Sequence, residues 1–278
     1  MQRRILYDNH NHSQFSFDGK RTSVRDAAAE AESKGLGGLC FTDHCDFFVP
    51  PMKAEHEKLV REVFDVEAQQ EEIRNVRSSF PDTGIFMGAE IGLYKDCRDK
   101  IRTFLSEHSF DQVIASVHYI DGTDPFYGGY YEGKDWKQAY GHYLETLYEE
   151  MKWLEDFDVM GHYDYVARYA PYPQTSIFYK DFSDILDEML TYLAHEGKAL
   201  EINTKSYQDY NGRTPELDTD ILLRYKEKGG EIISLGSDSH DPFRVGCNFD
   251  RFAELLKSLG FRYLAHFENR KLVQTRIQ

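Results

Sequence analysis

The stretch YDNHNHSQFSFDG, residues 7–19, follows a short apolar start and places two histidines one residue apart. Side chains alternate between the two faces of a β-strand, so His10 and His12 point the same way and Asn11 points the opposite way. Imidazole nitrogens are common metal ligands, and two of them a strand step apart can bind one ion. The pair therefore indicates a metal site at a strand end, although two polar residues satisfied by backbone groups are also compatible with it. Asp18, in the loop that follows, either folds back over the same face or is a turn residue before Gly19.

Short apolar runs, each bounded by polar or turn residues, recur along the chain as expected of buried strands. The predicted strands are 3–10, 35–44, 84–92, 111–119, 157–164, 198–203 and 231–240. Amphipathic helical patterns lie between them, at 22–35, 181–197 and 216–230. Strands that alternate with helices over about 250 residues predict an α/β fold with a parallel sheet, open or closed into a barrel. The simplest organisation is one domain, 1–278.

Polar side chains gather at the ends of these predicted strands. In chain order they are His10, His12, Asp43, His44, Glu90, His118, His162, Asp164, Asn203, Asp238 and His240. The carboxyl ends of parallel strands converge on one face of a barrel, so these residues are expected close together. Taken singly, each has another interpretation, such as a satisfied core histidine or a helix cap. Taken together, six imidazoles and at least three carboxylates suit two or three ions that share a bridging carboxylate.

The composition narrows the classes of partner. The 278 residues include 48 acidic and 33 basic ones, which gives a net charge of −15, and no run of five lysines or arginines occurs. Nucleic acid is therefore not expected as a partner, because its phosphates need a basic surface. No segment approaches the ~20 apolar residues that cross a bilayer, and the N-terminal apolar run is too short for a signal peptide. We expect a cytoplasmic protein with no membrane partner and four reduced cysteines; the sequence carries no signal for an oligomeric state.

The combined motifs resemble the PHP family (polymerase and histidinol phosphatase). They are HNH at 10–12, FSFDG with Asp18, TDH at 42–44, GAE at 88–90, SVH at 116–118, GH at 161–162 and SDSH at 237–240, in the order of the family. The segments GHYDYVARY and LEINT are further similar to the histidinol-phosphate phosphatase branch. This resemblance implies a distorted (β/α)7 TIM-like barrel. It also implies a site for two to three divalent ions, zinc, manganese or iron, at the C-terminal ends of the strands.

The resemblance also implies how the ligands are shared. One ion would be held by His10, His12, Glu90 and Asp238, a second by Glu90, His118 and His162, and a third by Asp18, His44 and His240. Arg168 is similar to an arginine that clamps phosphate, with a surface arginine as the alternative. Family members carry another arginine soon after LEINT; here Lys205 is near and Arg213 is farther along, so Arg213 is a candidate substrate contact. Tyr119 is expected either to pack against the substrate or to belong to the barrel rim.

The expected activity is hydrolysis of a small phosphomonoester, and the branch resemblance names L-histidinol phosphate, an intermediate of histidine biosynthesis. Water activated by the metal ions would attack phosphorus in line. The residues expected to take part in catalysis are Glu90, Asp238, His240 and Arg168. Alternatives are another small phosphate ester, a nuclease, an amidohydrolase, or a non-catalytic metal-binding protein. The missing basic stripe argues against a nuclease, and a glutamate in place of a modified lysine as the bridge argues against an amidohydrolase.

Overall fold

The computed structural model describes residues 6–48, 50, 63–210 and 212–278. In this part of the chain, nine strands form one sheet in chain order, parallel from the first to the eighth, with the ninth antiparallel to the eighth. The strands are β1 (Tyr7–Asn11), β2 (Gly38–Asp46), β3 (Gly84–Gly92), β4 (Gln112–Ser116), β5 (Val159–Met160), β6 (Ala199–Asn203), β7 (Ile233–Gly236), β8 (Tyr263–Glu268) and β9 (Lys271–Arg276). The predicted α/β fold with a parallel sheet is confirmed.

The sheet curls so that its first and seventh strands meet at their carboxyl ends. The amide of Asp238 donates to the carbonyl of His10 at 2.8 Å, and the amide of His12 donates to the carbonyl of Ser239 at 2.9 Å. Asn11 and Ser239 form a parallel bridge there. The first seven strands thus make a distorted barrel, joined by a short bridge and not by full strand pairing. That bridge brings the sequence HNH next to the sequence SDSH.

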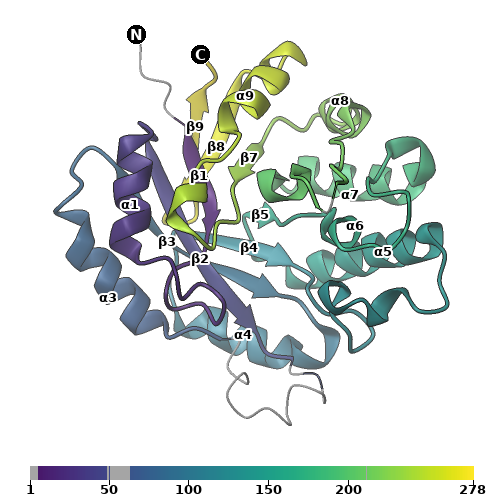
Figure 1. The fold of residues 1–278 in the computed structure, drawn as a ribbon, viewed down its shortest axis with the longest axis horizontal. Helices are drawn as coiled ribbons and strands as arrows, with labels where there is room; N and C mark the ends of the chain where they lie inside the picture. The colour runs from purple at the N-terminus through teal and green to yellow at the C-terminus, as the bar shows by residue number, and fades with distance from the viewer. Residues whose placement is uncertain (1–5, 49, 51–62, 211) are drawn as a thin grey trace.

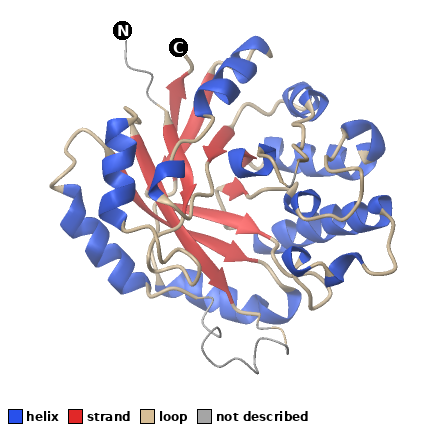
Figure 2. Cartoon of the chain, in the orientation of Figure 1, coloured by secondary structure: helices blue, strands red, loops and turns tan. Residues whose placement is uncertain are grey.

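Helices surround the sheet on the outside (Figure 1, Figure 2). They are α1 (Val24–Ser33), α3 (Val66–Arg77), α4 (Arg98–Glu107), α5 (Trp136–Leu154), α6 (Tyr165–Arg168), α7 (Ser183–His195), α8 (Thr219–Glu227) and α9 (Phe249–Ser258). Short 3-10 turns include η2 (Pro125–Tyr127) and η5 (Thr204–Tyr207), which follow β4 and β6. The N-cap serine Ser23 begins α1, whose apolar side turns Val24, Ala27 and Ala31 into the core. The predicted helices at 22–35, 181–197 and 216–230 correspond to α1, α7 and α8.

Two elements differ from the sequence predictions, the fifth strand and the C-terminal hairpin. The run 157–164 yields only the two-residue strand β5, because the chain turns away at Gly161 to begin the loop that leads to α6. The hairpin of β8 and β9 was not expected, since β9 has only two apolar residues, Leu272 and Val273, and is largely exposed. Residues 3–5 of the first predicted strand lie outside the described residues.

All four cysteines are free thiols. No helix among the described residues is long and apolar enough to span a bilayer.

Candidate active site

Six histidines gather at the carboxyl ends of the strands, as expected. His10 lies in β1 and His44 in β2, while the others follow the ends of β1, β4, β5 and β7. The distances between ring centroids are 5.2 Å for His10–His12, 4.2 Å for His12–His44, 4.1 Å for His12–His240, 4.9 Å for His44–His118, 5.4 Å for His118–His162 and 5.6 Å for His10–His162. Residues distant in sequence therefore form one continuous group of imidazoles.

Glu90, a fully buried residue of β3, lies at the centre of this group. Both of its carboxylate oxygens face histidine nitrogens. Oε2 lies 3.0 Å from His44 Nδ1, 3.3 Å from His10 Nε2 and 3.5 Å from His12 Nε2, and Oε1 lies 2.9 Å from His162 Nε2 and 3.1 Å from His118 Nε2. A carboxylate that meets five imidazoles through two oxygens has the arrangement that a bridging ligand needs.

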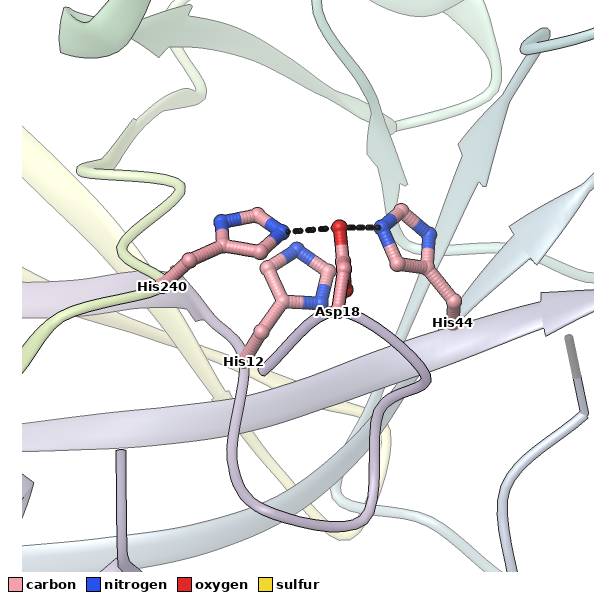
Figure 3. Close-up of side chains that lie close together, drawn as sticks. All are labelled: His12, Asp18, His44 and His240. Carbon is pink, nitrogen blue, oxygen red and sulfur yellow. Dashed lines mark ion pairs between the residues drawn. The ribbon is translucent and has the colours of Figure 1, made fainter. Parts of the chain in front are cut away.

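Asp18 lies beside three of the histidines, His12, His44 and His240 (Figure 3). Its Oδ2 lies 2.8 Å from His240 Nε2 and 3.6 Å from His44 Nε2. The loop after β1 thus folds back over the strand ends, as the sequence allowed. His12 joins the same set, since ligand atoms of all four residues lie within 4.8 Å of one another. Asp238, after β7, forms a further set with His10 and His12.

Asp46 belongs to the site although the sequence analysis did not single it out. It lies two residues after His44 on β2, so both side chains emerge on the same face. Its carboxylate oxygens each lie 3.1 Å from His118 Nδ1, and the three residues form another set within 4.8 Å. The signal that would have found it is the spacing HxD in TDHCD, which matches the one-apart spacing of HNH.

The buried atoms of this group fit divalent metal ions. Although three of the imidazoles lie 3.0–3.5 Å from Glu90 Oε2, their facing atoms are not oriented for a hydrogen bond. The buried atoms that make no hydrogen bond among the described residues are His10 Nε2, His12 Nε2, His44 Nδ1, His162 Nδ1 and Glu90 Oε2. A buried polar atom left without a partner costs about 1–3 kcal/mol. Such atoms gathered in one place are explained if ions bind them, and imidazole with carboxylate suits zinc, manganese or iron.

The ionisation of the site residues also favours bound metal ions. Burial raises the pKa of Glu90, but the histidines around it outweigh burial and hold that pKa well below its usual range. Burial lowers the pKa of His44, yet Asp18 and Glu90 more than compensate and raise it to about 10. Burial and the neighbouring imidazoles lower the pKa of His12. The carboxylates are therefore anionic and need positive charge beside them, which bound cations would supply in place of protons.

Arg168, in α6, is a buried residue of the site and not a surface arginine. Its Nη1 donates to Asp238 Oδ2 at 2.9 Å, and its Nε donates to Ser206 Oγ at 2.7 Å. Ser206 in turn donates to Asp164 Oδ1 at 2.6 Å. The remaining nitrogen, Nη2, has no partner among the described residues. The guanidinium is thus fixed on two sides and keeps one donor nitrogen for a ligand.

The two cations that follow LEINT lie in different places. Lys205 is the second residue after β6, and its Nζ lies 2.9 Å from Asp238 Oδ1 and 3.1 Å from His240 Nδ1. Arg213 forms a bridge with Tyr210, and its exposed guanidinium donates to the carbonyl of Tyr172 at 2.9 Å. Lys205 lines the cavity of the site and Arg213 does not. The lining of the cavity favours Lys205 over Arg213 as a cation beside a ligand, and a contact of Arg213 with substrate stays a prediction.

A cavity of about 350 Å³ opens over these residues. Metal-ligand candidates and the two cations line one part of it: Asp18, His44, His118, His162, Asp238, His240, Arg168 and Lys205. Aromatic side chains and two further carboxylates line the rest: Phe17, Tyr119, Phe126, Tyr127, Tyr165, Tyr169, Asp46 and Asp124. Tyr119 is buried in this lining, beside Phe48. The volume suits a small molecule.

Glu201, in β6 within LEINT, supports the site from behind. Its Oε1 lies 2.7 Å from His10 Nδ1, and its Oε2 accepts from the amide of His162 at 2.6 Å. A Cβ atom on Gly236 would collide with this carboxylate, and one on Gly92 would collide with that of Asp46. Glycines on the neighbouring strands therefore leave room for the two carboxylates that orient the histidines. Sequence periodicity marked Glu201 only as part of a buried strand.

A distorted α/β barrel with histidines and carboxylates converging at its strand ends defines a metal-dependent hydrolase of the barrel type. The chain matches the PHP domain model over residues 8–205 and belongs to the PHP family. Lactococcus lactis histidinol-phosphatase is 36% identical over 267 residues, which cover 95% of each chain. A probable histidinol-phosphatase of Clostridium acetobutylicum is 29% identical and covers 93% of this chain and 95% of its own.

Solved structures agree with the fold. The crystal structure of the Lactococcus lactis histidinol phosphate phosphatase, complexed with zinc, L-histidinol and phosphate, superposes with a TM-score of 0.85 at 33% identity. The match covers 96% of this chain and 98% of that one. The putative histidinol phosphatase of Listeria monocytogenes, 18% identical, superposes with a TM-score of 0.75 over 88% of this chain and 99% of its own, which supports the fold alone.

Proposed function

We propose that the protein is a metal-dependent phosphomonoesterase that hydrolyses L-histidinol phosphate to L-histidinol and phosphate, a reaction of histidine biosynthesis. The observation that carries the proposal is the carboxylate of Glu90 among five imidazoles, beside the fixed guanidinium of Arg168 in one small cavity. The similar Lactococcus lactis enzyme binds zinc, L-histidinol and phosphate, and the match spans nearly the whole of both chains.

We propose that two to three divalent ions occupy the site, with zinc, manganese or iron as the candidates. The ligands would be His10, His12, Asp18, His44, Glu90, His118, His162, Asp238 and His240, with Glu90 shared. Asp46 would act on His118 from the side away from Glu90, as carboxylates behind metal-bound histidines do. When bound, such ions lower the pKa of water and neutralise charge on phosphoryl oxygens.

The residues of the chain hold the phosphate for reaction. Arg168 presents its Nη2, and a guanidinium can donate to more than one phosphoryl oxygen. Lys205 adds a second positive charge next to Asp238 and His240. Asp238 thus fixes both cations relative to the ligand histidines. Because negative charge on the phosphoryl oxygens shifts during transfer, cations fixed in advance stabilise the transition state.

A small phosphate ester fits better than the other partners considered. The cavity of about 350 Å³ and the net charge of −15 disfavour a nucleic-acid chain. We place the protein in the cytoplasm, where free thiols such as its four cysteines stay reduced. We also propose that residues 1–278 form one domain, because the larger of two hydrophobic clusters among the described residues includes both Leu6 and Ile277.

The test is metal analysis together with a substrate panel. Protein purified without chelator should contain two to three transition-metal equivalents by elemental analysis. Loaded with zinc or manganese, it should hydrolyse histidinol phosphate in preference to p-nitrophenyl phosphate, a phosphodiester and an amide. Less than one metal equivalent after reconstitution would contradict the multi-metal site. Preference for the diester or the amide would point to the nuclease or the amidohydrolase instead.

A further inference from the structure

Behind the guanidinium of Arg168, two buried polar residues link the loops that follow β5 and β6. Asp164 directly precedes α6, and Ser206 lies in η5, with exposed fractions of 7% and 1%. Neither residue lines the cavity of the candidate active site. Both line a second, narrow cavity of about 10 Å³, and Arg168 borders both cavities. Arg168 therefore separates the active-site cavity from a pair of residues that lies outside it.

The two ends of this series of hydrogen bonds fix the orientation of the hydroxyl between them. The Asp164 carboxylate accepts, and Ser206 donates to its Oδ1 at 2.6 Å. A guanidinium can only donate, and Arg168 Nε donates to Ser206 Oγ at 2.7 Å. A hydroxyl has a single hydrogen atom, so once Asp164 accepts it, the oxygen of Ser206 presents its lone pairs to the guanidinium. Asp164 thus orients the hydroxyl that holds Arg168.

Asp164 occupies the N-cap position of α6, but its side chain does not cap the helix. An aspartate at this position usually accepts from a backbone amide of the first helical turn. Asp164 also belongs to none of the groups of metal-ligand candidates among the described residues. Its carboxylate instead bonds to side chains of η5, those of Ser206 and Tyr207. It therefore serves the loop after β6, and through Ser206 it acts on Arg168.

The planar shape of the guanidinium carries the effect of Ser206 into the cavity. Nη1 of Arg168 donates to Asp238 Oδ2 at 2.9 Å, while Nε is held by Ser206. The nitrogens of a guanidinium lie in one plane at fixed angles, so holding two of them fixes the direction of the third. That third nitrogen, Nη2, makes no hydrogen bond among the described residues. Loss of the contact with Ser206 would leave the guanidinium free to turn about its contact with Asp238.

We propose that Ser206 and Asp164 are positioning residues, which aim Nη2 of Arg168 at the phosphoryl group of the substrate. The inference rests on the proposed function, since it assigns both residues to the arginine that holds the substrate's phosphate. Neither residue lines the active-site cavity, so neither meets the leaving alcohol. Their loss should therefore slow the hydrolysis of every phosphomonoester by the same factor, and only while Arg168 is present.

The experiment is a double-mutant cycle on the metal-loaded protein, with histidinol phosphate and p-nitrophenyl phosphate as substrates. Ser206→Ala should lower kcat/KM by about tenfold on both, within the range for losing a hydrogen bond to a charged group. It should also weaken inhibition by inorganic phosphate and leave the metal content unchanged. In the Arg168→Ala background the same substitution should cost less than about twofold, because the group that it positions is gone. A serine that only supports the fold would cost the same factor in both backgrounds.

Ser176→Ala is the matched control. Ser176 is also buried and lines the same narrow cavity, but its hydroxyl accepts from the amide of Glu216 and not from Arg168. Its activity should stay within about twofold of wild type. Asp164→Asn is a second, nearly isosteric variant, which decides the matter if Ser206→Ala loses its metal. An amide can donate to Ser206 Oγ as well as accept from it, so we expect about a threefold loss on both substrates, absent without Arg168.

The possible failures are distinguishable. If wild type hydrolyses neither ester, the proposed function fails and the inference fails with it. If it hydrolyses p-nitrophenyl phosphate alone, the proposed substrate fails, while the cycle on that ester still decides the role of Ser206. If wild type hydrolyses histidinol phosphate, but the losses stay within about twofold or are as large without Arg168 as with it, the proposed function stands and the positioning role is overturned. A loss on histidinol phosphate alone would also overturn it, because an arginine aimed at phosphate acts on both substrates.

Discussion

The metal-ligand candidates and the aromatic residues at the cavity mouth, Phe126 and Tyr127, belong to the same site but are held in opposite ways. His10, His12 and Glu90 are fully buried, on or directly after strands of the sheet. Phe126 and Tyr127 are more than half exposed, on a short 3-10 turn. The sheet thus fixes the groups that must act on phosphate, while a loop carries the groups that meet the variable part of a substrate. This division is common where function is placed on a rigid scaffold.

The difference also predicts how each region responds to substitution. A buried metal-ligand candidate contacts several other candidates. Its loss should therefore affect metal binding, activity and stability together. A residue at the cavity mouth contacts few neighbours, so its loss should affect one substrate and leave the rest of the molecule unchanged. Substitutions that separate these effects test whether the two regions are as distinct as their burial indicates.

The largest effect is expected for Glu90→Gln. An amide offers one weak carbonyl donor and no charge, so it cannot serve two ions at once, and turnover should be abolished with loss of metal by elemental analysis. The matched control is Glu150→Gln, a buried glutamate paired with Arg98, and neither residue lines the cavity. That variant should keep its metal and its activity. Near-normal turnover in Glu90→Gln would mean that Glu90 is only a strand-end carboxylate.

Arg168→Ala should have the next largest effect. Losing a charge-assisted contact to the transferring phosphoryl group should cost roughly 2–4 kcal/mol of transition-state stabilisation, or ~30- to ~1000-fold in kcat/KM. The variant should nevertheless keep its full metal content, which separates it from ligand variants. Arg168→Lys should recover only part of the loss, since an ammonium lacks the planar fork. Activity of Arg168→Ala within about threefold of wild type would exclude a phosphate clamp.

Glu201→Gln should act through the metal ions without abolishing the chemistry. The amide nitrogen would replace one carboxylate oxygen that now faces either His10 Nδ1 or the amide of His162. Loss of such a supporting carboxylate typically costs about 10- to 100-fold in metal affinity or activity. Chelator titration measures the affinity, and excess zinc should restore most of the activity. Loss of activity that excess metal does not restore, with normal affinity, would contradict a positioning role.

The sequence was sufficient to predict those site residues whose spacing follows a simple pattern. Alternation along a strand places His10 and His12 on one side, and the strand-end position of Glu90 follows from the apolar run before it. The spacing HxD also marks Asp46 beside His44, but the contacts of Glu201 depend on which strands are neighbours and on Gly236 across the sheet, and local patterns do not contain that information. The hairpin of β8 and β9 was missed for a related reason, because an exposed edge strand needs no continuous apolar run.

The smallest effects should distinguish Lys205 from Arg213, the two cations that follow the same strand. Lys205→Ala removes a positive charge that is 25% exposed and 2.9 Å from Asp238, so we expect about a tenfold loss in kcat/KM, less than for the buried Arg168 because water screens the contact. Arg213→Ala should stay within about twofold, since its guanidinium meets only the carbonyl of Tyr172 among the described residues. Phosphate inhibition measured on both variants should weaken for Lys205→Ala alone. The opposite order would mean that the loop carrying Arg213 moves over the cavity when substrate binds, and that the rim of this site extends beyond the residues that line it here.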